Sequence, residues 1–300
     1  MRDKTVLQSR YVPEELPHRE EQIHSIAEIL APALKGDRPS NILLLGKTGT
    51  GKTAVINYIG RQIRKAYPNG DSCVFVYINC AITDTIYGVM SKLASELISD
   101  EEFRIPATGL SLDRLKSDLM SYMDSRDRTF IVALDEIDLT SRMNGDDLLF
   151  QLMSMNDGMA SSRISLIGIT NNSKFADMLN PRISTRLSEV KMVFPPYTAE
   201  QIGDILSERA SLAFDKGILE EGVVSYCAAI VAKNGGDARR AIELLRMSAV
   251  IAERNGDSKV TEAHVKASKN VFEADAMTEV IRTLNLHSKL VLMSIIRNAD

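Results

Sequence analysis

The chain has 300 residues, of which 44% are hydrophobic and 25% charged, and its formal net charge is -4. This length predicts about two domains and leaves room for a substantial core, and the composition is that of an ordinary globular protein. The acidic balance excludes binding of polyanions through overall charge, so contact with nucleic acid requires a local basic patch or a further part of the protein. The polar N-terminus and the lack of an apolar run of about 18 residues argue against a signal peptide and a membrane partner. We therefore expect a cytoplasmic protein.

The first two thirds of the chain alternate short apolar runs with helix-like segments. After an irregular start (1–18), helices are expected at 19–34, 52–67, 85–98, 112–124 and 146–158, and strands at 41–45, 73–78, 129–134, 163–169 and 189–194. The apolar runs lack a polar face, which is typical of a parallel sheet covered by helices on both sides. This order predicts an α/β fold, a doubly wound parallel sheet of five strands.

The pattern changes at Pro195-Pro196 and becomes all-helical. Helices are expected at 198–212, 219–233, 237–254 and 261–280, and another apolar helix begins near 285. These signals predict a nucleotide-binding core at 1–195, a helical lid at 196–282, and the incomplete beginning of a third domain at 283–300.

The cysteines give no sign of a structural metal or disulfide framework. Cys73, Cys80 and Cys227 are far apart, and none forms a C-x-x-C pair. Buried reduced thiols are the expected outcome.

The segment Gly46–Thr53 matches the pattern G-x-x-x-x-G-K-[ST] between an expected strand and an expected helix. Glycines let such a loop curl so that its N–H groups face phosphate oxygens, and the following helix adds the positive end of its dipole. We expect it to bind ATP or ADP, with Lys52 on the β- and γ-phosphates and the Thr53 hydroxyl on Mg²⁺. A flexible surface loop is the alternative. The predicted nucleotide-binding residues here are Gly46, Lys47, Thr48, Gly49, Thr50, Gly51, Lys52, Thr53 and Ala54.

Two carboxylates, Asp135 and Glu136, end the apolar run 129–134. The carboxyl ends of parallel strands open onto the ligand crevice. Asp135 is expected to hold Mg²⁺ through water, and Glu136 to act as general base on the attacking water. A helix cap is the alternative for the pair taken alone, and Asp138 is expected to be a cap or structural residue.

This succession of motifs resembles the AAA+ ATPases. The resemblance implies that Asn171, in preference to Asn172, is the first sensor that orients the attacking water. It also implies that residues 180–187 form the arginine-finger region, which reaches the nucleotide of a neighbouring subunit. Arg182 and Arg186 are both candidates for this finger, and a solvated arginine is the alternative for each.

The run 235–240 (GGDARR) resembles the second sensor, in which an arginine of the lid touches the γ-phosphate. Arg239 is the expected sensor, with Arg240 on the lid surface and Asp237 capping the helix.

Three further segments resemble the archaeal origin-recognition and cell-division-control branch of replication initiators. Residues 12–22 are similar to its adenine-side segment, which implies that Val12, Pro13 and Leu16 sandwich the base. The insertion at 100–111 resembles the initiator-specific element that presses on DNA, with Thr108, Gly109 and Leu110 as contacts, although an ordinary solvent loop is the alternative. Residues 285–297 resemble the start of a winged-helix DNA-binding domain.

The resemblance implies an ATP-binding and slowly hydrolysing switch that recognises double-stranded origin DNA and helps to load the replicative helicase. Its expected partners are that DNA, the helicase, and another copy or paralogue of the chain. Two alternatives share the nucleotide motifs: a clamp-loader-type ATPase, and a signal-transducing NTPase that does not bind DNA.

Overall fold

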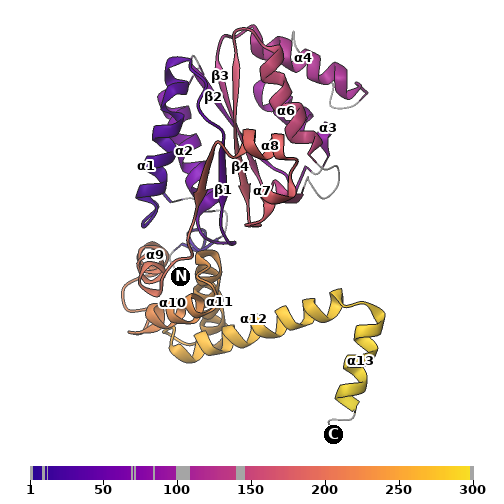
Figure 1. Cartoon of the computed structure of the whole chain (residues 1–300). Helices are drawn as coiled ribbons and strands as arrows, with labels where there is room; N and C mark the ends of the chain where they lie inside the picture. The colour runs from indigo at the N-terminus through magenta and orange to yellow at the C-terminus, as the bar shows by residue number, and fades with distance from the viewer. Residues whose placement is uncertain are drawn as a thin grey trace. The chain divides into compact units, whose positions relative to one another are not determined.

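The computed structural model describes residues 3–8, 11, 13–68, 70, 72–83, 85–98, 109–139 and 146–297. The chain separates into two compact units, one comprising Val12–Pro196 and the other Met1–Tyr11 together with Tyr197–Asp300. The first contains the sheet with its covering helices, and the second is helical (Figure 1). Among the described residues, no helix combines the length and apolar character that crossing a membrane requires.

The sheet of the first unit confirms the expected five parallel strands. They are β1 (Ile42–Leu45), β2 (Cys73–Asn79), β3 (Thr129–Asp135), β4 (Arg163–Thr170) and β5 (Val190–Val193), in the spatial order β2-β3-β4-β1-β5. In the register, Asp135 pairs with Ile169 and Asn79, while Leu45 pairs with Thr170. The carboxyl ends of β1, β3 and β4 therefore lie side by side, where a parallel sheet presents its ligand site.

Helices cover both faces of this sheet (Figure 1). One face packs against α1 (Glu20–Leu30), the 3₁₀ helix η1 (Ala31–Lys35) and α2 (Lys52–Ala66). The other packs against α3 (Ile86–Leu97), α4 (Leu112–Asp124), α6 (Asp147–Gly158), α7 (Phe175–Met178) and α8 (Pro181–Leu187). Alternate strand residues supply the two cores: Ile131 and Ala133 face the first, whereas Val132 and Leu134 face the second. Burial on both faces explains why the central strands β3 and β4 are apolar without alternation, whereas the edge strand β5 alternates between half-buried and exposed residues.

The second unit is built from α9 (Ala199–Ala213), α10 (Val223–Lys233), α11 (Ala238–Asn255), α12 (Glu262–Thr283) and α13 (Leu286–Arg297). Helix α9 starts with a capping box, in which the side chains of Thr198 and Gln201 each accept a hydrogen bond from the backbone N–H of the other. Helices α9 to α12 share one apolar core, whereas no side chain of α13 is buried.

The N-terminal segment differs from the expected division, which placed residues 1–195 in one domain. Val6 and Leu7 are buried in the apolar core of the helical unit. The ring of Tyr11 lies 4.4 Å below the Arg209 guanidinium, and the Asp3 N–H donates to the Ala213 carbonyl. The start of the chain thus groups with the helical unit, because its two apolar side chains find their core there.

Candidate nucleotide-binding site

The phosphate loop, residues 46–51, connects the end of β1 to the start of α2. Gly49 and Gly51 have φ angles of 73° and 92°, a conformation that residues with a Cβ rarely adopt. Gly46 is constrained by space, since a Cβ there would lie 2.6 Å from the Phe194 carbonyl oxygen. The backbone thus requires all three glycines of the motif, and it has the curled form in which N–H groups can surround phosphate.

Lys52 is the first residue of α2 and is only 5% exposed. Its ammonium donates to the carbonyls of Gly46 and Lys47 at 2.7 and 2.8 Å, and to Asn171 Oδ1 at 2.9 Å. These three oxygen atoms hold the Lys52 ammonium between the loop and Asn171, which follows the end of β4. The next two residues, Thr53 and Ala54, lie in the first turn of α2 and are half-buried.

The remaining loop residues differ in exposure. Lys47 and Thr48 are exposed, whereas Thr50 is fully buried and its hydroxyl donates to the Lys47 carbonyl at 2.9 Å. This hydrogen bond stabilises the curled form of the loop. The two lysines of the motif differ in exposure, because Lys47 is exposed and Lys52 is buried.

Asp135 ends β3 and is 4% exposed. Its Oδ2 accepts hydrogen bonds from the Thr53 hydroxyl and the Tyr77 hydroxyl, both at 2.7 Å, and its Oδ1 accepts from the Glu136 N–H at 2.9 Å. Three donors on α2, β2 and the chain after β3 thus orient this carboxylate. The sequence analysis gave Tyr77 no role, although the alternation of β2 puts it on the same face as Asn79, the strand partner of Asp135.

Glu136 adopts a φ angle of 55°, which is rare for a residue that is not glycine. Such a backbone costs on the order of 1–3 kcal/mol and occurs preferentially at functional sites. Strain at the residue proposed as general base is consistent with a backbone shaped for function.

The donor set around Asp135 fits Mg²⁺. A carboxylate and the Thr53 hydroxyl are oxygen ligands of the kind that this ion prefers, with water completing its shell. Burial, together with the carboxylates of Asp135, Glu136 and Asp138, raises the pKa of the Cys80 thiol to about 12. Without a metal ion, the thiol is therefore protonated at neutral pH. All three cysteines are buried and free, as expected.

Asn171 and Asn172 follow β4 but make different contacts. Asn171 accepts from Lys52, whereas the Asn172 side chain accepts from the Lys174 N–H and donates to Met178 Sδ. Asp138 accepts from the Thr170 hydroxyl at 2.7 Å, which supports the end of the same strand. Of the two asparagines, Asn171 is the one whose hydrogen bond joins it to Lys52, so it lies beside the phosphate loop.

Arg182 and Arg186 both lie on α8, a short helix that the sequence analysis did not predict. Arg186 forms an ion pair with Asp157 at 3.0 Å. Arg182 is exposed in the first turn, where its N–H donates to the Asn180 side chain at 3.1 Å. Both arginines line a groove of about 740 Å³, together with the exposed ring of Phe150. Because the guanidinium of Arg186 is held by Asp157, the side chain of Arg182 is the less constrained of the two.

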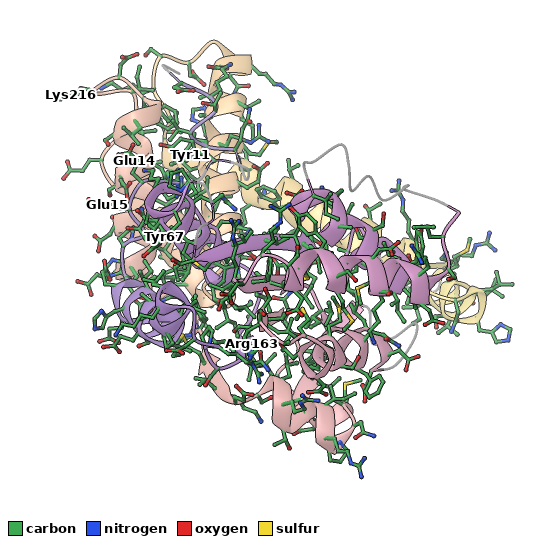
Figure 2. All side chains as sticks on the ribbon, turned by 90° about the horizontal axis from the view of Figure 1, so that it is seen from above. Tyr11, Glu14, Glu15, Tyr67, Arg163 and Lys216 are labelled. Carbon is green, nitrogen blue, oxygen red and sulfur yellow. The ribbon has the colours of Figure 1, made fainter. Side chains whose placement is uncertain are left out.

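The expected adenine-side segment lies against α1 and α2. Val12 is outside the described residues. Pro13 is buried, and its carbonyl accepts from Arg61 of α2 at 2.8 Å, while Leu16 packs against the core beneath α1 and α2. Glu14 and Glu15 between them, labelled in Figure 2, are exposed. The hydrogen bond from Arg61 to Pro13 therefore places this N-terminal segment against α2, the helix that begins at Lys52.

Arg239 belongs to the helical unit. Helix α11 begins at Ala238, and the Asp237 side chain accepts from the Arg240 N–H at 3.1 Å, so Asp237 caps the helix as expected. Arg239 and Arg240 are both exposed in the first turn. Exposure leaves either arginine available to a ligand.

The expected DNA contacts lie just before α4. Thr108 is outside the described residues. Gly109 is exposed with a φ angle of 98°, Leu110 is half-buried, and Ser111 caps α4 by accepting from the Arg114 N–H. The two described residues thus form a turn that presents Gly109 to solvent.

Two family models match the chain, one for each unit. The AAA ATPase domain matches residues 15–166, and the Cdc6 AAA+ ATPase-type lid domain matches residues 203–270. Together they follow the expected order of a nucleotide-binding core and a lid.

Relatives match nearly the whole chain. The ORC1-type DNA replication protein of Thermococcus onnurineus is 45% identical over 98% of this chain and 71% of that protein, and its Methanoregula boonei counterpart is 44% identical over 98% and 70%. The solved structure of the Aeropyrum pernix ORC1 protein in complex with DNA has a TM-score of 0.84 at 43% identity and covers 99% of this chain and 76% of that chain. That of Cdc6p from Pyrobaculum aerophilum has a TM-score of 0.77 at 29% identity, over 98% and 78%. The chain therefore belongs to the ORC1-type DNA replication proteins, a family of AAA+ ATPases.

Proposed function

We propose that this protein is an ATP-controlled replication initiator that binds double-stranded origin DNA and helps to load the replicative helicase. The observation that carries the proposal is the likeness to the Aeropyrum pernix ORC1 structure, whose partner is DNA, at 43% identity over 99% of this chain. The same family membership favours an initiator over the clamp-loader and signal-transducing alternatives. In this proposal hydrolysis is slow and resets the switch, so its output is conformational.

The proposed chemistry is transfer of the γ-phosphoryl group of ATP to water. Lys52 and the loop N–H groups bind the phosphates, and Asn171 and Glu136 orient and deprotonate the attacking water. Thr53 and Asp135 hold Mg²⁺, which when bound neutralises charge on the β- and γ-phosphate oxygens. Pro13 and Leu16 contact the adenine. Phosphoryl transfer requires mainly positioning and charge stabilisation. Hydrogen bonds join Lys52 to Asn171 and Thr53 to Asp135 at one edge of the sheet, which supports this proposal.

Three arginines complete the proposal. Arg239 serves as the second sensor that detects the γ-phosphate. Arg182 or Arg186 serves as the finger that stabilises transition-state charge at the nucleotide of another copy or a paralogue. The ion pair with Asp157 favours Arg182 for this role, because Arg186 would first have to leave a carboxylate.

The Tyr77 hydroxyl offers a test of how Asp135 is oriented. Tyr77→Phe removes one of the two donors to Asp135 Oδ2 and leaves the phosphate loop intact. Loss of such an outer-shell partner typically weakens metal binding about 10- to 100-fold. We expect the Mg²⁺ concentration for half-maximal ATP hydrolysis to rise by about tenfold, and binding of Mn²⁺ in the presence of ADP, measured by electron paramagnetic resonance, to weaken similarly.

The control for this variant is Tyr67→Phe. Tyr67, which is labelled in Figure 2, follows the last residue of α2 and packs against the same apolar core as Tyr77. ADP affinity in EDTA should remain unchanged in both variants, since neither hydroxyl belongs to the phosphate loop. Equal metal dependence of Tyr77→Phe and the wild type would contradict the orienting role.

DNA binding by the intact chain tests the proposed function directly. Fluorescence anisotropy with a labelled duplex should show binding that is roughly tenfold tighter with ATP than without nucleotide, the range of an ordinary coupling between sites. Affinity should fall with salt, because release of counterions from phosphates drives such binding. A replication origin and a scrambled duplex of equal length serve as the two probes.

Leu110→Asp should weaken this binding, since it places a carboxylate on the turn proposed to press on DNA. Leu212→Asp adds the same charge at an exposed position of α9 and should bind like the wild type. Duplex affinity that is identical with and without ATP, and identical for both probes, would overturn the proposal of an ATP-controlled origin binder.

A further inference from the structure

Arg19 is a charged side chain that is buried within the nucleotide-binding unit, at 2% exposure. It precedes the first residue of α1, and the sequence analysis gave it no role. Its Nε donates to the Thr50 carbonyl at 2.9 Å, its Nη2 to the Pro195 carbonyl at 2.8 Å, and its Nη1 to the His18 carbonyl at 2.9 Å. One guanidinium thus joins the start of α1 to two segments that are remote in sequence.

The segments held by Arg19 are the phosphate loop and the chain that follows β5. Thr50 is a fully buried loop residue. The guanidinium also lies 5.7 Å from the centroid of the Phe194 ring, and the Phe194 carbonyl closely approaches Gly46 at the other end of the loop. The loop is therefore fixed at Thr50 by a hydrogen bond and confined at Gly46 by the backbone of Phe194.

We propose that Arg19 is a positioning residue of the nucleotide site. Its rigid planar fork donates to the Thr50 and Pro195 carbonyls at once, which fixes the Thr50 peptide and with it the direction of neighbouring loop N–H groups. Its buried charge is little screened and adds to that of Lys52 in attracting a polyphosphate. The proposal rests on the nucleotide-binding function proposed for the loop.

Two substitutions separate the geometry from the charge. Arg19→Lys keeps the charge but has one compact ammonium that cannot span both carbonyls, whereas Arg19→Met removes the charge and all donors. Arg64→Met is the matched control. The Arg64 guanidinium also lies over an aromatic ring, Phe75 at 5.6 Å, but Arg64 is exposed on the last turn of α2, at the end of that helix remote from the loop.

Hydrogen–deuterium exchange of the intact chain without nucleotide is the first measurement. In Arg19→Lys, peptides covering 46–53 and 190–197 should exchange about tenfold faster or more, the effect of losing one hydrogen bond to a charged group. The peptide covering β3 should exchange as in the wild type. Calorimetry with ADP should then show affinity weakened about tenfold in Arg19→Lys and further in Arg19→Met, with Arg64→Met unchanged.

Two results would overturn the positioning role. One is loop exchange and ADP affinity that match the wild type in both Arg19 variants. The other is faster exchange spread evenly over the unit, which would make Arg19 a general stabiliser. If Arg19→Met does not fold, loop exchange and ADP affinity in Arg19→Lys still test the positioning role. Failure of the wild type to bind ADP would instead refute the proposed nucleotide function. Exchange of the loop peptides would in that case still show whether Arg19 holds the loop in place.

Discussion

Lys52→Ala is expected to abolish ATP and ADP binding at concentrations that saturate the wild type. The Lys52 ammonium is buried and held by the Gly46 and Lys47 carbonyls and by Asn171, so it lies where a phosphate chain would enter the loop. Each hydrogen bond to a charged group contributes about 1.5–3 kcal/mol, and Lys52 can donate more than one to a polyphosphate. Affinity should therefore fall by at least about a hundredfold, measured by isothermal titration calorimetry.

Lys47→Ala is the matched control for this variant. It removes the same charge from the same loop, but Lys47 is exposed and only its carbonyl contacts Lys52. We expect its ATP affinity to stay within a fewfold of the wild type, because exposed charges are strongly screened. Far-UV circular dichroism should show both variants folded. Unaltered ATP affinity in folded Lys52→Ala would contradict the phosphate-loop role.

The architecture of the nucleotide-binding unit could be predicted from the sequence because its signals are local. Each strand has four to eight residues and is mainly apolar, and the G-x-x-x-x-G-K-[ST] pattern requires a strand before it and a helix after it. The order of the strands then places Asp135, Asn171 and the loop at one edge, so the main parts of the site follow from topology. Helix α8 was missed because seven residues are too few to show a helical period.

Contacts between remote segments could not be predicted in this way. Tyr77 and Asp135 are 58 positions apart, and Arg19 and Pro195 are 176 apart. The sequence around Tyr77 or Arg19 does not show which oxygen atom accepts its hydrogen bond, because the partner depends on strand register and on loop packing. The association of Val6 and Leu7 with the helical unit has the same origin, since an apolar pair near a terminus can be buried in either core.

The proposed mechanism assigns nucleotide binding and hydrolysis to different residues, and this assignment can be tested at the acidic pair. In the proposed mechanism, binding depends on Lys52 and Thr53, and hydrolysis depends on Glu136. The Lys52 ammonium donates to Gly46, Lys47 and Asn171, and the Thr53 hydroxyl donates to Asp135. Asp135 uses one oxygen for the Thr53 and Tyr77 hydroxyls and the other for the backbone N–H of Glu136. This leaves Glu136 as the member of the pair whose carboxylate is assigned to the attacking water.

Glu136→Gln is therefore expected to bind ATP like the wild type and to lose hydrolysis. Glutamine has the same shape but cannot accept the proton of water, and loss of a general base typically lowers the rate about 10²- to 10⁴-fold. Single-turnover release of phosphate measures the rate, and calorimetry measures the affinity. Asp138→Asn is the control, because Asp138 accepts from the Thr170 hydroxyl and an asparagine oxygen can do the same. Turnover of Glu136→Gln equal to that of the wild type would show that Glu136 is not the base.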